Sequence, residues 1–240
     1  RDVVARGIDH ELKISGEEFV YLDITHKNPR DVIDHFPNIY KKCLSVGIDL
    51  TKDMIPVVPA AHYCCGGVKV DLNGQSSIRR LYALGETSST GLHGGNRLAS
   101  NSLMEAAVYA DAAARHSIGL IDSIELQHNI PDWDDEGTAA PEEMALITQN
   151  YKEMQQIMSN YVGIVRSNLR LERAKRRLEI IYKETEELYL KSTLSQHLCE
   201  LRNMIAVGYL IIKQAEALHQ SIGLHYSIDY PPTNQPQVNK

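Results

Sequence analysis

A glycine-rich segment that holds one acid and one arginine occupies residues 81–103. A short apolar run ends in a Gly-Glu pair at Glu86, a loop with several glycines leads to Arg97, and Asn101 and Ser102 are both good N-caps for a following helix. A strand, a glycine loop and a helix N-terminus together favour an anion or nucleotide site, because free backbone N–H groups point outward there. An acid at the end of a strand suits ribose hydroxyls. An ordinary turn followed by a capped helix is the alternative interpretation.

A second candidate site lies at residues 62–67, which read His-Tyr-Cys-Cys-Gly-Gly. Gly66 and Gly67 allow a backbone or a planar ligand to approach closely. His62 ends an apolar run, and a histidine there is more often a structural residue than a site residue. It becomes a candidate because a histidine and an arginine such as Arg97 suit one carboxylate.

Several sequence motifs are absent. The chain holds no Gly-x-Gly-x-x-Gly and no Gly-x-x-x-x-Gly-Lys-Ser/Thr, so a loop for the diphosphate of a dinucleotide is not in it. It holds no Cys-x-x-Cys and no Cys–His pair with zinc spacing, so we predict no metal site. The four cysteines are expected to be reduced thiols, as in a cytoplasmic protein.

Hydrophobic periodicity predicts helices and strands of mixed order. Helical patterns cover 2–14 and 29–47, the latter with a break near Pro37, and an alanine-rich helix covers 101–116. Strands are expected at 18–25, 55–61, 68–70 and 81–84. Three amphipathic stripes after residue 142 indicate a small helical bundle. We therefore expect a mixture of α+β and α/β structure, divided into 1–47, 48–116, a linker at 117–141, a helical domain at 142–232 and a frayed tail at 233–240.

Composition narrows the class of protein. The chain has 240 residues, of which 43% are hydrophobic and 23% charged, with a formal net charge of −6. These values exclude a disordered tail and a small disulfide scaffold. They disfavour a general nucleic-acid binder, because nothing overall attracts phosphate. No stretch approaches the roughly 18 uncharged apolar residues of a membrane span, so we expect neither nucleic acid nor membrane as a partner.

The motifs at 62–67 and 85–105, together with Arg1-Asp2-Val3-Val4-Ala5-Arg6, resemble the flavoprotein family of succinate dehydrogenase, fumarate reductase and L-aspartate oxidase. Within that family, the run Leu-Ala-Ser-Asn-Ser at 98–102 favours the L-aspartate oxidase branch, since the dehydrogenases more often carry glycines there. The resemblance extends to 161–166 and 223–231, which are similar to the C-terminal helical domain of that branch.

The resemblance implies a flavoenzyme of three parts. The chain would hold the end of a capping domain, the second segment of a split FAD-binding domain and a C-terminal three-helix bundle. The first FAD segment, with its diphosphate loop, would lie upstream of Arg1. That arrangement agrees with the absent glycine motif.

The resemblance also implies a role for particular residues. His62 and Arg97 would clamp a substrate carboxylate, and Arg1 would handle the proton on the carbon opposite flavin attack. Because a guanidinium hardly deprotonates, Arg1 would chiefly position the substrate in aspartate oxidation. The FAD would be held by the Glu86 side chain at its ribose, by the backbone of Ser102 and Leu103 at the flavin, and by Gly66 and Gly67 along its length.

The implied activity is the oxidation of L-aspartate to iminoaspartate, with FAD as cofactor and either oxygen, giving hydrogen peroxide, or fumarate as acceptor. This is the first step of de novo NAD synthesis, in the cytoplasm, and quinolinate synthase would be a partner. Two alternatives stay open: a succinate or fumarate oxidoreductase flavoprotein, and an inactive fragment that lacks the diphosphate-binding segment. The sequence departs from the family pattern at Gly95, where alanine is usual, and at Cys64, where threonine is usual.

Overall fold

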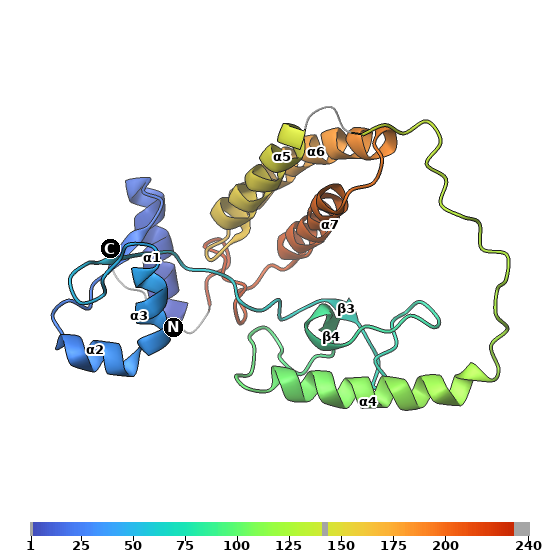
Figure 1. The fold of residues 1–240 in the computed structure, drawn as a ribbon, viewed down its shortest axis with the longest axis horizontal. Helices are drawn as coiled ribbons and strands as arrows, with labels where there is room; N and C mark the ends of the chain where they lie inside the picture. The colour runs from blue at the N-terminus through green and yellow to red at the C-terminus, as the bar shows by residue number, and fades with distance from the viewer. Residues whose placement is uncertain (1, 141–143, 233–240) are drawn as a thin grey trace. The chain divides into compact units, whose positions relative to one another are not determined.

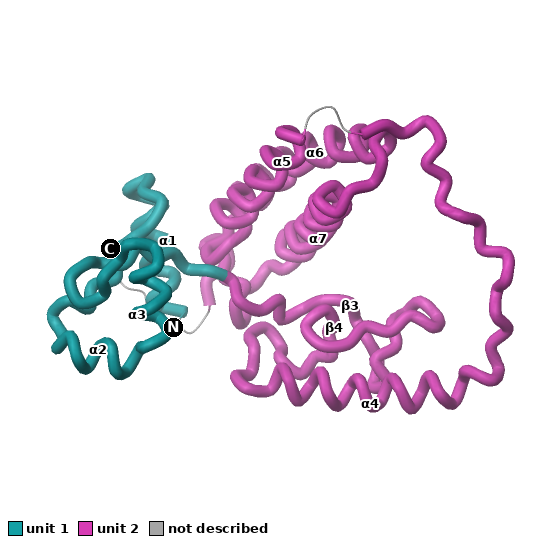
Figure 2. Tube along the Cα trace, viewed as in Figure 1, with its two compact units in different colours: residues 1–60 teal, residues 61–240 magenta. Residues whose placement is uncertain are grey.

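The structure is a computed structural model that describes residues 2–140 and 144–232. The chain forms two compact units that divide between residues 60 and 61 (Figure 2). Each unit mixes helices with a few short strands, so the predicted α+β character is confirmed.

The first unit contains three helices and one pair of strands, which are α1 (Asp2–Ser15), β1 (Val20–Leu22), α2 (Pro29–His35), α3 (Pro37–Leu44) and β2 (Ile55–Val57). Strands β1 and β2 are antiparallel, with Val20 opposite Val57. The side chain of Asn28 caps α2 by accepting a hydrogen bond from the Arg30 N–H. The break near Pro37 therefore lies where the sequence predicts it, while the strands are shorter than expected.

The second unit begins with the glycine-rich segment. It contains β3 (Val68–Lys69), a short 3₁₀ turn η1 (Gly85–Thr87), β4 (Ser88–Ser89) and the long helix α4 (Ser102–Ile121), and β3 pairs with β4 in parallel. The expectation of a strand at 81–84 was wrong. That run makes only an isolated bridge from Tyr82 to Gln75 across a tight turn, so it has no partner strand to extend along.

Helix α4 continues five residues into the segment 117–141 that was expected to be a linker. Apolar side chains at Ile118, Leu120 and Ile121 maintain the helical pattern, and Gly119 is tolerated inside it. Beyond the helix, residues 124–137 run without regular structure (Figure 1).

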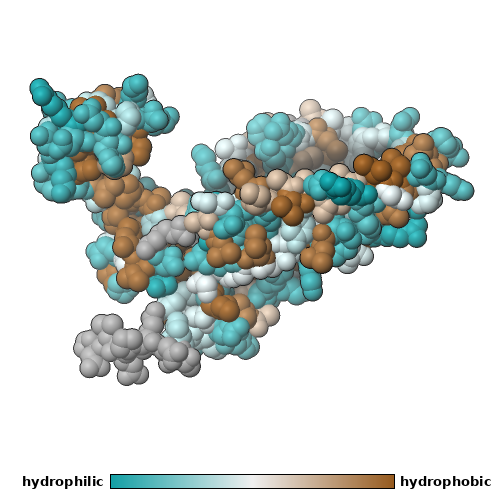
Figure 3. Space-filling model, turned by 90° about the horizontal axis from the view of Figure 1, so that it is seen from below, coloured by the Kyte–Doolittle hydropathy of each residue, from teal (hydrophilic) through white to brown (hydrophobic). Residues whose placement is uncertain are grey.

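One face of α4 exposes an apolar stripe. Small residues occupy its middle and larger ones its ends, and every member is exposed: Leu103, Ala107, Ala110, Ala114, Ile118 and Ile121. Figure 3, seen from below Figure 1, shows hydrophobic residues at the surface of the molecule. A stripe of alanines at helical spacing allows another element to approach the helix closely.

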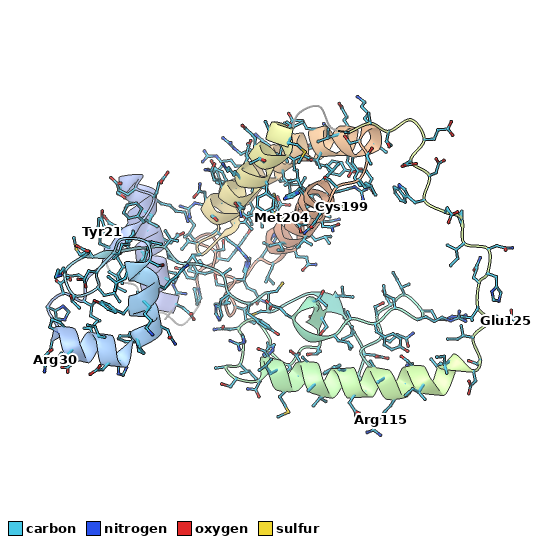
Figure 4. The ribbon with its side chains drawn as sticks, viewed as in Figure 1. Tyr21, Arg30, Arg115, Glu125, Cys199 and Met204 are labelled. Carbon is cyan, nitrogen blue, oxygen red and sulfur yellow. The ribbon has the colours of Figure 1, made fainter. Side chains whose placement is uncertain are left out.

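The remaining helices form the predicted bundle: α5 (Met144–Ile157), a π-helical turn η2 (Met158–Val162), α6 (Asn168–Lys191) and α7 (Gln196–Ala217). Ser167 caps α6 and Ser195 caps α7 through their side-chain oxygens. Each helix packs on the other two, and Met204 of α7 lies on the side that faces α5 (Figure 4). The core is formed by Ile147, Met154, Ile157, Val162, Leu171, Ala174, Leu178, Ile181, Leu198, Leu201, Ile205, Ile212 and Ala215.

Within the described residues, no helix is both long enough and apolar enough to cross a bilayer.

Leu198 provides a test of the bundle core, because its side chain is fully buried. We expect Leu198→Ala to lower the free energy of unfolding by about 3 kcal/mol, from lost transfer energy and a residual cavity. Leu190 on α6 is 73% exposed, so Leu190→Ala should change it by less than about 0.5 kcal/mol. Urea unfolding followed by far-UV circular dichroism measures both values, and equal losses would contradict this core.

Candidate functional site

Arg97 stands at the end of the glycine loop with its side chain half-buried. Its Nε donates a hydrogen bond to the hydroxyl of Ser102, 2.5 Å away, at the start of α4. The guanidinium carbon lies 5.1 Å from the centre of the Tyr63 ring, over its face. Within the described residues, its two terminal amino groups make no hydrogen bond or ion pair. A planar pair of free N–H donors is the arrangement that binds a carboxylate through two parallel bonds.

Beside Arg97, a buried acid and a buried histidine face each other. The side chain of Glu105 on α4 is 2% exposed and that of His93 is 6% exposed, and His93 Nε2 lies 2.9 Å from Glu105 Oε2. His93 Nδ1 accepts a hydrogen bond of 3.2 Å from the backbone N–H of Leu98. Nδ1 thus acts as the acceptor, while Nε2 lies close to the carboxylate without the geometry of a hydrogen bond.

Two hydroxyl groups complete the surroundings of Glu105. Thr90 donates a short hydrogen bond to Oε1, and the Tyr63 hydroxyl lies 3.5 Å from Oε2 as a second donor. The carboxylate therefore accepts hydrogen bonds from two donors, Thr90 and Tyr63, and has the His93 ring beside it. A buried carboxylate is stable in a fold when such donors replace the water that it lost.

Glu86 connects the two segments that sequence analysis singled out. Its Oε1 accepts a hydrogen bond of 3.0 Å from the backbone N–H of Cys64, while the side chain remains exposed. Gly67, at a φ of 139°, has room for no side chain, because a Cβ there would lie 2.2 Å from the Thr87 carbonyl oxygen. Gly67 thus permits β3 to pair with β4, which is a structural reason for this glycine. A Cβ added at Gly66, in contrast, would make no close contact.

The N-terminus of α4 differs from the expectation of a side-chain cap. Asn101 occupies the N-cap position but makes no capping hydrogen bond, and its amide donates to the Ala99 carbonyl instead. The Ser102 hydroxyl is engaged by Arg97, and the Leu103 side chain is 86% exposed. The first backbone N–H groups of this helix are left for an electronegative ligand.

The structure brings only some of the predicted site residues together. His62 is exposed, and within the described residues its side chain makes no hydrogen bond or ion pair, but its neighbour Tyr63 lies under Arg97. Arg1 lies outside the described residues. Cys65 adjoins Arg97, and burial raises the pKa of its thiol although the Arg97 backbone N–H and guanidinium oppose that rise.

The glycine loop is also supported from the C-terminal side. Leu224 N–H donates to the Gly95 carbonyl at 2.8 Å, and a Cβ on Gly223 would lie 2.1 Å from that same oxygen. Next to this turn, His225 Nδ1 lies 2.7 Å from a terminal nitrogen of Arg166. Burial, followed by the charge of Arg166, lowers the pKa of His225, so this histidine is neutral and accepts.

Sequence reasoning missed four of the residues that build this site: Tyr63, Thr90, His93 and Glu105. His93 stands within the loop Gly-Leu-His-Gly-Gly, and Glu105 is the only acid in the first turns of α4. An acid in the apolar and alanine-rich first half of this helix was the available signal, because such a side chain needs donors if it is buried. Among the residues that the structure describes, no group of three or more His, Cys, Asp or Glu side chains could hold a metal ion.

Glu105 gives a test of this buried cluster. We expect Glu105→Ala to lower the opening free energy of α4 by about 3 kcal/mol, because the hydroxyls of Thr90 and Tyr63 lose their acceptor and the buried His93 loses its charged neighbour. Glu179 on α6 is 63% exposed and pairs with Lys183, so Glu179→Ala should cost less than about 0.5 kcal/mol. Hydrogen exchange of helix amides, resolved by mass spectrometry, measures both, and unchanged protection of α4 in Glu105→Ala would contradict the cluster.

Two family models match the chain. The model of an FAD binding domain matches residues 1–103, and the model of the fumarate reductase flavoprotein C-terminus matches residues 151–239.

Curated relatives cover nearly all of the chain. L-aspartate oxidase of Yersinia pestis is 49% identical over 231 residues, which are 96% of this chain and 43% of that protein. L-aspartate oxidase of Acinetobacter baylyi is 49% identical over 98% of the chain, and the chloroplastic L-aspartate oxidase 2-b of Nicotiana tabacum is 43% identical over 96% of it. The chain spans 43% of the Acinetobacter protein and 38% of the Nicotiana protein.

Solved structures give a similar result. The Mycobacterium smegmatis Sdh1 complex in the apo form matches with a TM-score of 0.79 and 27% identity, over 98% of this chain and 43% of that one. A quinol-fumarate reductase with menaquinol molecules matches with a TM-score of 0.78 and 26% identity, over 100% of this chain and 45% of that one. Over nearly all of its length, the chain is therefore similar to the flavoprotein family of L-aspartate oxidase, succinate dehydrogenase and fumarate reductase, and its first 103 residues match the model of an FAD binding domain.

Proposed function

We propose that this chain works as part of an FAD-dependent L-aspartate oxidase, which converts L-aspartate to iminoaspartate. The observation that carries the proposal is the placement of Arg97, which is fixed to Ser102 through Nε while its terminal amino groups stay free. A carboxylate-binding arginine thereby adjoins the helix N-terminus that is proposed to contact the flavin. The 47–49% identity to several curated bacterial L-aspartate oxidases favours that member of the family.

The residues present fit FAD in three places. The exposed Glu86 carboxylate has one oxygen on the Cys64 N–H, which leaves the other for ribose hydroxyls. The uncapped backbone N–H groups at Ser102 and Leu103 would donate to flavin oxygen or nitrogen atoms. A Cβ added at Gly66 would make no close contact, so this glycine leaves space along the cofactor. Gly67 would contribute to the cofactor site indirectly, because it allows β3 to lie against β4. Bound FAD supplies a two-electron acceptor.

Substrate recognition follows from charge. L-aspartate carries two carboxylates, so its binding needs cationic donors in a protein whose formal net charge is −6. Arg97 would bind one carboxylate through its two amino groups, and the exposed His62 beside Tyr63 would add a donor. Orienting the substrate in this way presents its Cα–H for oxidation. Arg1 is proposed to hold the opposite side of the substrate, as the family resemblance implies.

The exposed apolar stripe of α4 supports a divided FAD-binding domain. Parallel strands normally lie in larger sheets that are covered on both faces, yet β3 and β4 form a pair of two residues each, and Val68 and Lys69 are exposed. We propose that the remainder of the FAD-binding domain, including a diphosphate loop, packs on α4 and extends this sheet.

Other parts of the proposal depend on the resemblance alone. They are the acceptor, either oxygen or fumarate, the place of the reaction as the first step of NAD synthesis, a cytoplasmic location, and a contact with quinolinate synthase. A succinate or fumarate oxidoreductase is the second candidate, because the matching solved structures belong to that group.

Arg97 allows a direct test in the FAD-loaded protein. We expect Arg97→Leu to raise the KM for L-aspartate about a hundredfold, because a bidentate charged pair is lost. Arg115 on α4 (Figure 4) is exposed, and its one ion pair among the described residues is with Asp111, so Arg115→Leu should leave KM unchanged. Hydrogen peroxide release with L-aspartate, and none with succinate, is the expected substrate pattern. The reverse pattern would support the second candidate, and a normal KM in Arg97→Leu would refute the clamp.

Glu86 tests the cofactor site separately. We expect Glu86→Gln to weaken FAD binding about tenfold, because an uncharged amide bonds ribose hydroxyls less strongly than a carboxylate does. The amide oxygen can still accept the Cys64 N–H, so the fold should persist. Glu125 lies in the irregular segment after α4 (Figure 4), and Glu125→Gln provides the same charge change elsewhere. Quenching of FAD fluorescence on titration gives both affinities, and equal values would contradict this role of Glu86.

A further inference from the structure

Tyr63 is a residue to which the family resemblance assigns no role, and it lies in the middle of the site. Its hydroxyl contacts Glu105, its ring makes a T-shaped contact with the ring of His93, and its face contacts the guanidinium of Arg97. It therefore stands between the buried cluster and the half-buried arginine.

The ring face constrains Arg97. The guanidinium carbon lies 5.1 Å from the ring centroid, within the range of an attractive cation–π contact. The Nε bond to Ser102 fixes one edge of the guanidinium, and the ring fixes one face. Together they define the direction in which the two free amino groups point.

The Tyr63 ring is itself held by its contact with His93. The rings of His93 and Tyr63 are 5.2 Å apart and nearly perpendicular, at 82°. His93 also faces Glu105 at 2.9 Å, and both side chains are more than nine-tenths buried. His93 further accepts the backbone N–H of Leu98, which directly follows Arg97. The same two buried groups thus locate both the ring and the backbone beside the arginine.

From these contacts we propose that Tyr63 is a positioning residue for Arg97, supported by the buried pair of Glu105 and His93. This inference rests on the proposed function of Arg97 as a carboxylate clamp. Pre-orienting the guanidinium reduces the side-chain entropy that is lost when a dicarboxylate binds. A bond made equally to the bound substrate and to the transition state affects KM rather than kcat, so the role of Tyr63 belongs to binding.

The test measures succinate binding to FAD-loaded protein by calorimetry, corrected for FAD content. We expect Tyr63→Leu to weaken succinate binding about tenfold, through the lost ring contact and the freed side chain. Tyr63→Phe keeps the ring and loses only the 3.5 Å hydroxyl contact, so its affinity should stay within about threefold of wild type. In turnover of L-aspartate, KM should rise in Tyr63→Leu while kcat per bound FAD is retained.

Tyr82 offers a matched control. It is also half-buried, its hydroxyl lies 2.6 Å from His116 Nδ1, and the two rings meet edge to face. Tyr82→Leu therefore removes the same side chain from the same kind of partner, and it should leave succinate affinity unchanged. Equal losses in Tyr63→Leu and Tyr82→Leu, or unchanged affinity in Tyr63→Leu, would overturn the inference.

A second measurement does not depend on whether the Tyr63→Leu variant folds. A ring face shifts the NMR signal of a proton above it upfield. The Arg97 Nε–H signal, assigned through Arg97→Lys, should therefore lie upfield of the Arg115 Nε–H signal, because Arg115 also donates a hydrogen bond through Nε but lies over no ring among the described residues. An unshifted signal would overturn the positioning role. The proposed function would fail without the inference about Tyr63 if the wild-type protein does not oxidise L-aspartate while its succinate binding still depends on Tyr63. Wild type that binds no succinate would overturn the inference together with the clamp.

Discussion

The candidate site depends on one buried carboxylate. Glu105 has exchanged water for the hydroxyl donors of Thr90 and Tyr63 and for a close approach of the His93 ring. Burial of a charged group is tolerated only when such donors are held in place. Tyr63 comes from the His62 segment, while Thr90 and His93 come from the glycine-rich segment, so the acid joins these two segments to α4 at one point.

Arg97 gains its properties from that junction. It is not paired with the buried acid, because Tyr63 and His93 occupy that carboxylate, and so its terminal donors remain available. Had Arg97 formed an ion pair with Glu105, the site would be internally neutralised. A chain with a net charge of −6 can in this way present a local cationic site to an anionic substrate. The bundle core, in contrast, is formed mainly by apolar side chains, with Asn150 and Thr185 as buried polar residues of its helices.

Periodicity predicted the long elements well. The helices from Asp2, Pro29 and Pro37 and the three bundle helices lie where the apolar spacing indicates, because burial of one helical face determines that spacing. The run 81–84 failed, since four apolar residues do not reveal whether a partner strand exists, and here a turn lies beside them. The capping prediction for Asn101 failed because its backbone is in the right-handed helical region, whereas a capping residue is usually extended.

The site was predictable only in part. Arg97, Glu86 and the start of α4 were identified because charge and glycine next to a helix start are visible in the sequence. Tyr63 and Glu105 are 42 residues apart, and nothing local indicates that their side chains meet. Gly67 illustrates a third case, in which a glycine that was expected to make room for a cofactor makes room for the Thr87 carbonyl.

A crystal structure of the FAD-loaded protein with succinate would test the central claim most directly. The account predicts a succinate carboxylate about 2.9 Å from both terminal nitrogens of Arg97, with the guanidinium still over the Tyr63 ring and Nε still on Ser102. A carboxylate bound elsewhere, or an Arg97 guanidinium paired with a protein carboxylate in place of the substrate, would contradict it.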